Sequence, residues 1–383
     1  MNILLLSGFF NHHLKPVSDQ LYRNDRVTHY FVSTEPMPEE RKTFGYHMEQ
    51  FPPYVCPAYE SEIQKRRALA LLDEADVVIT GSALESMVRR CVWKNKLIFR
   101  YAERPVKIRE PLKYFPRLLR WNWRNPFWKP IYLLAASAYS AADYARFGMF
   151  RNRAYKWGYF TEMKKYEDID GFLSEKAAAD ILWCGRFIDW KHPDDALLAV
   201  KKLKAEGYVF RMRFVGCGDQ EAKLRDMVRD YDLTDCVEFL GSMAPERVRE
   251  HMESAGIYLF TSDKQEGWGA VLNESMNSGC AVIASHAIGA VPFLMKDGEN
   301  GLIYRSGDVE MLCDKIRYLL DHPLEQKRLG KAAYETIVNE WNAEVAAERV
   351  VALAQAILDG EKHPDLYKTG PCSQTGILAD DWF

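Results

Sequence analysis

Short apolar runs that alternate with helical stretches limit the possible folds of this 383-residue chain more than any other feature of its sequence. Strands and helices in such alternation form parallel sheets whose strands are joined by crossover helices. The sequence therefore predicts an α/β protein with doubly wound, Rossmann-like sheets. The runs interpreted as strands are residues 2–6, 26–33, 76–81, 97–101, 131–135, 181–185, 211–215, 237–240, 257–261, 281–284 and 302–304.

The alternation is interrupted by a polar stretch over residues 163–174, which we interpret as an interdomain linker. A chain of this length is expected to hold two domains of ordinary size. We therefore expect a first domain over residues 1–165 and a second over residues 175–345. A long amphipathic helix is expected over residues 343–358, followed by a loop-like tail. Residues 346–383 are therefore expected to form a C-terminal segment separate from the second domain.

Composition and charge are those of an ordinary globular protein, with 48% hydrophobic and 27% charged residues. The net charge of −3 by itself indicates no class of partner. Eight cysteines are scattered without a CxxC pair or a metal-ligand spacing, which favours small core residues in a reducing compartment. The first residues lack a charged signal-peptide region and no apolar run is long enough to span a membrane, so we expect a cytoplasmic protein.

Two carboxylates, Glu266 and Glu274, lie eight positions apart, and Gly267 and Gly269 form a Gly-x-Gly turn directly after the first. A strand-type run precedes them and a helical run follows, so Glu274 is expected about one turn into a helix. Ligands of open α/β sheets bind at this carboxyl edge of the strands, and a glycine turn lets backbone N–H groups approach a phosphate. Carboxylates beside such a site are suited to accept hydrogen bonds from sugar hydroxyls. The alternative is a pair of solvated glutamates at a helix end.

The Glu-x7-Glu spacing, with the segments 275–285 and 296–304 that follow it, resembles the donor-site signature of the family 4 retaining glycosyltransferases. This resemblance implies the GT-B architecture, in which two doubly wound Rossmann-like domains face a cleft and the final helix crosses back to the first domain. It also implies that Glu274 binds the ribose of a nucleotide sugar and that Glu266 contacts the donor sugar. Trp268 stands where relatives have Phe or Tyr, so we expect an aromatic wall at the sugar. The donor-side backbone is expected from Gly267, Trp268, Gly269, Ala270 and Val271.

A phosphate site is predicted upstream, where Gly185 and Arg186 end a strand-type run and Lys191 follows five positions after the arginine. Arg186 offers a planar fork of donors and Lys191 a mobile point charge. The resemblance implies that both bind the donor diphosphate in place of a metal ion. We therefore expect no metal site, and no cofactor besides the nucleotide sugar as co-substrate. For Lys191 the alternative is an exposed, solvated side chain.

Further turns are expected around the nucleotide. Relatives shape the nucleotide pocket at the position of residues 215–219, although an ordinary tight turn fits the same pattern. They hold the base through main-chain groups at the segment that ends in Met243. Because main-chain recognition leaves little trace in a sequence, the base is not readable here, and UDP is expected in preference to GDP. In the first domain, the amide of Gly8 is expected to approach the donor phosphate.

The first domain of such proteins holds the acceptor, and His12, His13 and Glu103 are the candidates on that side. Neighbouring side chains of an extended segment point in opposite directions, so only one histidine is expected to reach a sugar. Glu103 lies about where relatives place a histidine near the reacting sugar. A salt bridge with Arg100 or Arg104 is the alternative for Glu103.

Residues 104–130 are strongly basic and rich in aromatic side chains. Cationic and indole groups together suit an anionic lipid interface, which would place the protein peripherally on the inner face of a membrane. A solvated helical hairpin with inward-packed tryptophans is the alternative, and nucleic acid is a competing partner for which no recognition motif is found. The cations are Arg104, Lys107, Arg109, Lys113, Arg117, Arg120, Arg124 and Lys129, and the single acid is Glu110. The interleaved aromatic residues are Trp121, Trp123, Phe127 and Trp128.

These features together predict a retaining glycosyltransferase that moves a hexose-type sugar from a nucleotide diphosphate to a glycan or lipid-linked acceptor, as in bacterial surface polysaccharide synthesis. No second carboxylate is placed as a nucleophile, so we expect a front-face reaction. In it Arg186 and Lys191 stabilise the leaving diphosphate and Glu266 orients the sugar. Two alternatives remain: a GT-B nucleotide-sugar epimerase and a non-catalytic nucleotide-sugar-binding subunit.

Overall fold

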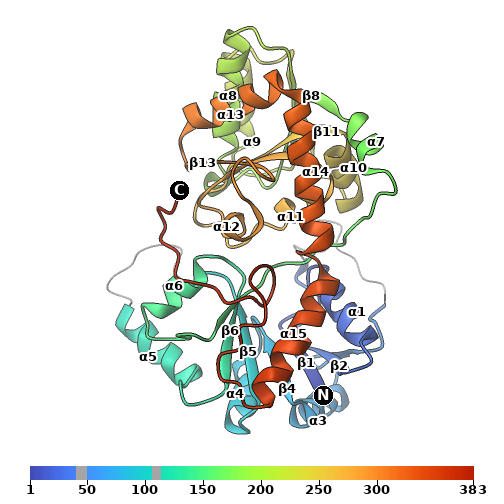
Figure 1. Ribbon diagram of the computed structural model, residues 1–383, viewed down its shortest axis with the longest axis vertical. Helices are drawn as coiled ribbons and strands as arrows, with labels where there is room; N and C mark the ends of the chain where they lie inside the picture. Colours follow the sequence, from blue (N-terminus) through green and yellow to red (C-terminus); the bar gives the residue numbers. More distant parts are fainter. Residues whose placement is uncertain (40–49, 106–113) are drawn as a thin grey trace. The chain divides into compact units, whose positions relative to one another are not determined.

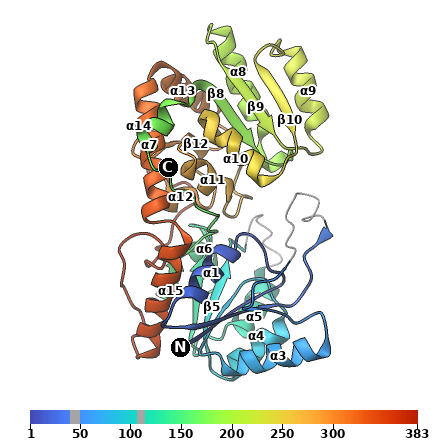
Figure 2. The same ribbon diagram turned by 90° about the vertical axis from the view of Figure 1, so that its right-hand side faces the viewer.

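The computed structural model describes residues 1–39, 50–105 and 114–383, which fall into two units (Figures 1 and 2). Unit 1 comprises residues 1–162 and 341–380, and unit 2 comprises residues 163–340 and 381–383. Each unit contains a parallel β-sheet with helices packed on it, so the expectation of two doubly wound α/β sheets is confirmed. Among the described residues, no helix combines the length and the apolar character needed to cross a bilayer.

The sheet of unit 1 has seven parallel strands in the order β3-β2-β1-β4-β5-β6-β7. Leu4, Leu5 and Leu6 of β1 are all buried, as expected for a parallel strand covered on both faces. The strands are β1 (Asn2–Ser7), β2 (Thr28–Ser33), β3 (Val55–Pro57), β4 (Val77–Thr80), β5 (Leu97–Ala102), β6 (Ile131–Ala135) and β7 (Ala154–Lys156).

The helices of unit 1 include the last helix of the chain, α15, which packs against α1. It begins at Ala343, where the Asn342 side chain accepts a hydrogen bond from the Val345 N–H and caps the helix. The helix therefore belongs to unit 1 although it follows unit 2 in the sequence. The bounds are α1 (Lys15–Arg23), α3 (Glu62–Glu74), α4 (Glu85–Trp93), α5 (Tyr114–Arg124), α6 (Ser140–Ala145) and α15 (Ala343–Leu358).

The sheet of unit 2 has six parallel strands in the order β10-β9-β8-β11-β12-β13. The strands are β8 (Ala177–Cys184), β9 (Arg211–Val215), β10 (Val237–Gly241), β11 (Ala255–Phe260), β12 (Ala281–Ser285) and β13 (Leu302–Tyr304). The α-helices are α7 (Ile169–Ser174), α8 (Pro193–Ala205), α9 (Glu221–Asp230), α10 (Pro245–Ser254), α11 (Val271–Asn277), α12 (Val291–Leu294), α13 (Val309–Asp321) and α14 (Pro323–Asn339). In both sheets the order reverses beside the first strand of the unit, which creates a switch point at β1 and β4 and another at β8 and β11.

Three elements differ from the sequence-based expectation. Strands β3 and β7 were not predicted; each has only three residues and lies at an edge of its sheet. The polar stretch 163–174 is not a linker throughout: α7 occupies its second half and belongs to unit 2. The Asp168 side chain accepts from the Gly171 N–H at the start of α7, and Leu173 is buried, so local capping and one apolar anchor form a helix in a polar segment.

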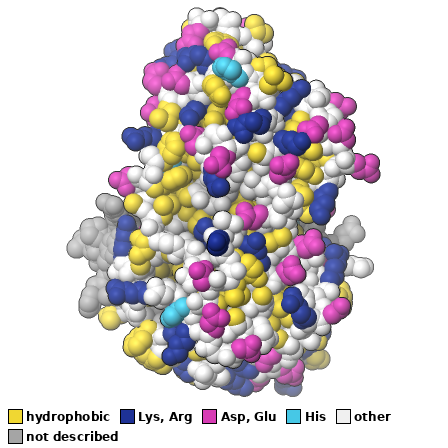
Figure 3. All heavy atoms as spheres, viewed as in Figure 1, with side chains coloured by type: hydrophobic (Ala, Val, Ile, Leu, Met, Phe, Trp, Pro, Cys, Tyr) yellow, Lys and Arg dark blue, Asp and Glu magenta, His cyan; other side chains and the backbone are white. Residues whose placement is uncertain are grey.

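The surface in Figure 3 bears side chains of both charges, interspersed with apolar ones. Over the described residues of that face, charge is mixed and does not form a field of one sign. A nucleic-acid-binding surface is expected to be a basic stripe or patch, so this face does not have that character.

Candidate functional site

The switch point of unit 2 lies between β8 and β11, which pair with each other in the middle of the sheet. Ligands of open α/β sheets bind beyond the carboxyl ends of the strands at such a point. Gly185, Arg186 and Lys191 follow β8, and Glu266 follows β11. The fold thus brings the predicted phosphate residues and the first predicted glutamate to one edge of one sheet.

An ion pair joins these two loops. Lys191 Nζ lies 2.6 Å from Glu266 Oε2, and Ser262 Oγ donates to the same oxygen at 3.0 Å. Only 12% of the Lys191 side chain and 11% of the Glu266 side chain are exposed. The alternative of a solvated Lys191 is therefore wrong, and a cation and a carboxylate stand together where a ligand is expected.

Further contacts with neighbouring residues fix the position of Lys191. Thr261 Oγ1 donates to the Lys191 carbonyl at 2.7 Å and accepts from the Trp183 indole N–H at 2.9 Å. The Lys191 ammonium lies 4.9 Å from the centre of the Trp190 ring and 5.8 Å from that of Phe260, within the range of cation–π attraction. Thr261 was not singled out from the sequence, although its position directly after β11 was a usable signal.

Glu274 lies one turn into α11, as the sequence predicted. Burial raises the pKa of its carboxyl to about 7, against a smaller opposing effect of Arg249. Its side chain is half-buried, and the described residues supply no hydrogen bond to its carboxylate. The carboxylate is therefore available to a hydroxyl donor, and a fully solvated glutamate does not fit this environment.

The pKa of Cys184, at the end of β8, depends on the charges of both Glu274 and Lys191. Burial raises the pKa of its thiol to about 12; the charge of Glu274 adds to the rise and that of Lys191 opposes it. Lys191 follows β8 and Glu274 follows β11, so the parallel strands also bring both residues to the carboxyl edge of the sheet.

Two glycine turns bring backbone segments close together at this edge. Gly216, directly after β9, has φ +137°, and a Cβ there would lie 1.9 Å from the Gly185 carbonyl oxygen. Gly269 has φ +86°, and a Cβ there would lie 2.3 Å from the Phe260 ring. The fold itself requires glycine at both positions, so a tight turn explains residues 215–219 and a role in the nucleotide pocket stays a prediction.

The expected aromatic wall at Trp268 is wrong. The indole is fully buried, its Nε1 donates to Asn273 Oδ1 at 2.9 Å, and its ring centre lies 6.3 Å from that of Phe293. A ring inside the core cannot contact a ligand. The Trp268 ring packs in the core beneath its own loop. Only backbone groups of residues 267–271 therefore remain as candidate contacts to a donor.

The remaining donor-side candidates follow β8 and β10 in unit 2 and β1 in unit 1. Arg186 is exposed after β8, and Met243 is half-buried after β10. In unit 1, the Gly8 N–H donates to the Ser82 carbonyl. The expected use of that amide for a phosphate is not supported, because the group is already engaged with the backbone.

In unit 1, the three acceptor-side candidates form one cluster beyond the carboxyl ends of the strands. The rings of His12 and His13 are 3.7 Å apart, because residues 12–14 form a turn and not the extended segment assumed from the sequence. The His13 ring stacks on Tyr159 at 5.1 Å, and the Tyr159 hydroxyl donates to Glu103 at 2.6 Å. Tyr159 was missed because β7, which precedes it, was missed.

The proposed alternative partners of Glu103 are engaged with other carboxylates. Arg100 pairs with Glu85 at 3.7 Å, and Arg104 pairs with Asp143 at 3.0 Å. Neither arginine depends on Glu103 for charge compensation.

Only part of the basic stretch 104–130 lies on the surface of the protein. Arg104 is buried and also pairs with Asp380 at 2.9 Å, so it cannot belong to a lipid-facing surface. Lys107, Arg109, Glu110 and Lys113 lie outside the described residues, as does the side chain of Arg117.

A possible metal-binding group lies at the start of α8. His192, Asp194 and Asp195 offer ligand atoms within 4.8 Å of one another, and His192 Nε2 lies 3.5 Å from Asp263 Oδ2. Acidic residues in the first turn of a helix are also favourable without an ion, because they compensate the helix dipole. Metal independence stays a prediction.

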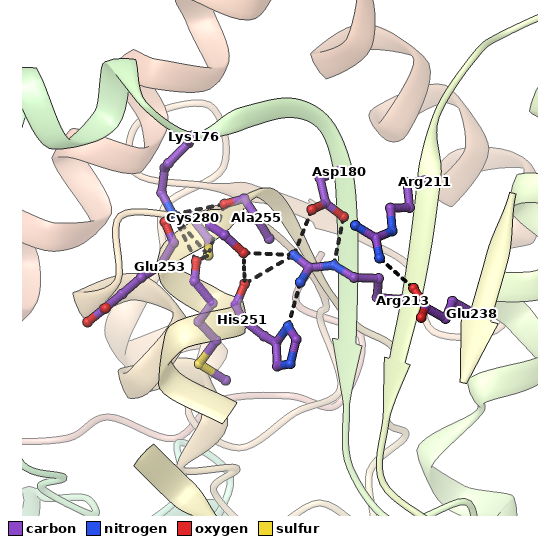
Figure 4. A network of polar contacts seen from close by, with 11 residues as sticks. Lys176, Asp180, Arg211, Arg213, Glu238, His251, Glu253, Ala255 and Cys280 are labelled. Carbon is purple, nitrogen blue, oxygen red and sulfur yellow. Dashed lines mark hydrogen bonds and ion pairs between the residues drawn. The ribbon is translucent and has the colours of Figure 1, made fainter. Parts of the chain in front are cut away.

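A polar network joins β8, β9 and α10 (Figure 4). Arg213 Nε donates to Asp180 at 2.8 Å, Arg213 Nη1 lies 2.5 Å from His251 Nδ1, and Lys176 donates to three backbone carbonyls in and just after α10, each at 2.8 Å. Lys176 precedes β8, so the network extends toward the amino end of the strands. Its charges are compensated internally, which indicates a structural role.

Comparison with known proteins agrees with the position of this site. Residues 165–336, most of unit 2, match the model of the family described as Glycosyl transferases group 1. The amylovoran biosynthesis glycosyltransferase AmsK of Erwinia amylovora is 27% identical over 182 residues, which are 46% of this chain and 44% of that protein. The D-inositol 3-phosphate glycosyltransferase of Corynebacterium diphtheriae is 28% identical over 195 residues, or 49% of this chain and 45% of that protein. The chain thus spans less than half the length of these curated relatives.

Solved structures extend the likeness to both units. The crystal structure of Anabaena HepE in complex with UDP superimposes with a TM-score of 0.68, 14% identity and coverage of 93% of this chain and 99% of that one. At that identity the likeness shows the fold alone. The structural neighbours are GT-B glycosyltransferases, so the expected fold class is confirmed.

Proposed function

We propose that this protein is a retaining, metal-independent glycosyltransferase that transfers a sugar from a nucleotide diphosphate to a hydroxyl of a glycan or lipid-linked acceptor. The observation that carries the proposal is the ion pair of Lys191 with Glu266 at the switch point of unit 2, with Glu274 in the helix that follows β11 at the same edge. A nucleotide sugar presents phosphates, a sugar and a ribose, and the edge offers a cation and two carboxylates. The match of residues 165–336 to the glycosyl transferases group 1 supports this assignment.

In the proposed complex, Lys191 exchanges its contact with Glu266 for the donor diphosphate. Glu266 keeps the hydrogen bond from Ser262 and accepts from a hydroxyl of the donor sugar. Glu274 accepts from the ribose hydroxyls. Arg186 supplies the second cation. We take UDP as the first nucleotide to test, because HepE was solved with UDP.

The reaction follows from this arrangement. The bond between the anomeric carbon and the diphosphate oxygen breaks as the acceptor hydroxyl forms a new bond on the same face of the sugar. Charge builds up on the leaving diphosphate, where Lys191 and Arg186 stabilise it; one preorganised donor of this kind is worth about 3 kcal/mol. The departing phosphate oxygen takes the proton of the acceptor hydroxyl. The retaining outcome rests on the resemblance of the Glu-x7-Glu segment.

The acceptor is assigned to unit 1 and its cluster of His13, Tyr159 and Glu103. Two stacked rings offer a flat apolar face, and a carboxylate beside them can accept from sugar hydroxyls. Such a surface suits a carbohydrate. The relation to the amylovoran enzyme makes bacterial surface polysaccharide synthesis the proposed setting, with the protein on the inner face of the membrane.

A panel of nucleotide sugars separates this proposal from its alternatives. Release of the free nucleoside diphosphate, with the product anomer identified by NMR, supports a retaining transferase. An isomerised donor would instead show an epimerase, and binding without any conversion would show a non-catalytic subunit. Inversion at the anomeric carbon would overturn the retaining mechanism alone.

A further inference from the structure

A group of large aromatic side chains is exposed on α4 and on the segment from α5 to Lys129. The exposed fractions are 71% for Trp93, 59% for Trp123, 75% for Phe127 and 69% for Trp128. Side chains of this size normally bury most of their area in a core or an interface. Trp121 of the same segment does so: its ring packs edge-to-face on that of Phe147, 4.6 Å away.

The exposed rings belong to one surface and not to separate places. The Arg89 guanidinium lies 4.8 Å from the centre of the Trp93 ring and 4.0 Å from that of Trp123, so one cation joins the two helices. Lys129 Nζ donates to Asn95 Oδ1, just after α4, at 3.4 Å. We call this surface, made of Arg89, Trp93, Arg120, Trp123, Phe127 and Trp128, the α4–α5 face.

Two further contacts give the α4–α5 face a fixed shape. The Glu85 carboxylate on α4 lies 3.5 Å from Arg124 Nε on α5. Arg153 Nη1 donates to the carbonyls of Phe127 and Lys129, at 3.0 Å each. These side-chain contacts therefore fix the backbone that carries the exposed rings.

The charge of the face is positive. Residues 114–130 contain no acidic residue, and Glu85, the only acid of α4, is already paired with arginines. Arg89 and Arg120 form no ion pair within the described residues, whereas the neighbouring Arg90 and Lys94 are compensated by Asp73. A cationic face with exposed indoles is complementary to anionic headgroups above an acyl layer.

We propose that the α4–α5 face docks the protein on a membrane that contains anionic phospholipid. The indole rings enter the boundary between headgroups and acyl chains, and the guanidinium groups contact lipid phosphates. The surface differs from the stretch expected from the sequence: it gains Arg89 and Trp93 from α4 and excludes the buried Arg104. It does not depend on the proposed transferase activity.

The test uses the full chain and vesicles of phosphatidylcholine, with or without phosphatidylglycerol. Sedimentation of protein with vesicles measures binding. We expect binding to the anionic vesicles, weaker binding at high salt, and little binding to neutral vesicles. Replacing Arg89 and Arg120 together (Arg89→Gln and Arg120→Gln) should weaken binding about fivefold per residue. The double change Trp93→Ser and Trp128→Ser should weaken binding to the same vesicles without affecting folding, because both rings are exposed.

Matched controls come from unit 2. Val209 and Leu324 are 89% and 82% exposed, and Val209→Ser with Leu324→Ser should leave vesicle binding unchanged. Arg305→Gln removes an exposed cation elsewhere and should also have no effect. Equal binding to neutral and anionic vesicles, or undiminished binding of the two double variants, would overturn the proposal.

Two other outcomes also decide the question. Concentration-dependent dimerisation that is abolished by Trp93→Ser and Trp128→Ser, without vesicle binding by the parent, would assign the face to a second copy of this chain. Release of nucleoside diphosphate from a nucleotide sugar, measured without vesicles, should be the same in parent and variants. A parent that binds vesicles but consumes no nucleotide sugar would contradict the proposed function and leave the membrane surface intact.

Discussion

The ammonium of Lys191 lies 2.6 Å from the carboxylate of Glu266, although 75 positions separate the two residues in the sequence. The pair is mostly shielded from solvent and lies at the carboxyl edge of the unit 2 sheet. Each charge compensates the other. A donor that carries both phosphate and hydroxyl groups can satisfy both charges at once, which is the basis of the proposed donor site.

Removing one member of this pair should destabilise the protein. Glu266→Gln leaves Lys191 partly desolvated without its charged partner, so we expect a loss of about 1.5–3 kcal/mol in the free energy of unfolding, measured by urea denaturation. The matched control is Lys331→Met, whose partner Asp170 is largely exposed, and it should cost at most about 1 kcal/mol. Equal effects of the two variants would show that the Lys191–Glu266 pair has no special strength.

The pKa of Glu274 predicts a pH dependence of donor binding. Its carboxyl has a pKa raised to about 7 by burial, so the ionised form, the better acceptor for ribose hydroxyls, increases as pH rises through that value. Calorimetry should therefore show tighter binding of UDP-glucose at about pH 8 than at about pH 6, by up to about tenfold. UDP-glucose is preferred to UDP because its diphosphate does not titrate in this range.

Glu274→Gln is the control for this pH dependence. It should weaken binding and make it independent of pH, whereas an unchanged slope would assign the titration to another group. Stability should respond in the opposite direction. A pKa raised above the value of the unfolded chain contributes stability that is fully present below about pH 4.5 and is lost as pH rises through about 7.

Gly216→Ala should damage the edge of the sheet itself. The added Cβ would lie 1.9 Å from the Gly185 carbonyl oxygen at a φ of +137°, so we expect a loss of at least about 1–3 kcal/mol in unfolding free energy. Gly207→Ala has a positive φ of +89° but open space around it, and it should cost about 1 kcal/mol. If both variants unfold at the same urea concentration, the close approach of the β8 and β9 turns is not important for stability.

A change in the acceptor cluster should lower the rate of sugar transfer and leave the rate of donor hydrolysis unchanged. Tyr159→Phe removes the hydroxyl that donates to Glu103 at 2.6 Å but keeps the ring that stacks on His13. Transfer to a glycan acceptor should fall by about tenfold to a hundredfold, for one hydrogen bond to a charged group. Hydrolysis of the donor in the absence of acceptor should be unchanged. Equal loss of both rates would place Tyr159 in the donor site or in the fold.

The sequence predicted the two sheets well, because their central strands are long, apolar and bounded by turn residues. It missed β3 and β7, which have three residues each, whereas the equally short β13 lies within segment 296–304, which resembles known relatives. The Glu-x7-Glu spacing located Glu266 and Glu274 correctly in a loop and a helix. It could not show that Trp268 faces the core, because an aromatic residue after a glycine fits a core and a ligand wall equally well.

Contacts between distant segments were also outside the reach of the sequence. The partnership of Lys191 with Glu266, and of Tyr159 with Glu103, depends on which strand ends meet at an edge. The Arg89 bridge to Trp123 likewise joins two helices whose pairing is set by the fold. Residue type indicated the chemistry of these groups, and the sheet order determined their partners.

The most direct test of the central claim is the release of UDP from UDP-sugars in the presence of a chelator. We predict that the parent protein releases UDP from at least one sugar of the panel, and that Lys191→Met and Arg186→Ala each slow release by about 10²–10³-fold. Folded parent protein that consumes no nucleotide sugar, or that does so only after a divalent ion is restored, would contradict the account of Lys191 and Arg186 as the cations of the leaving diphosphate.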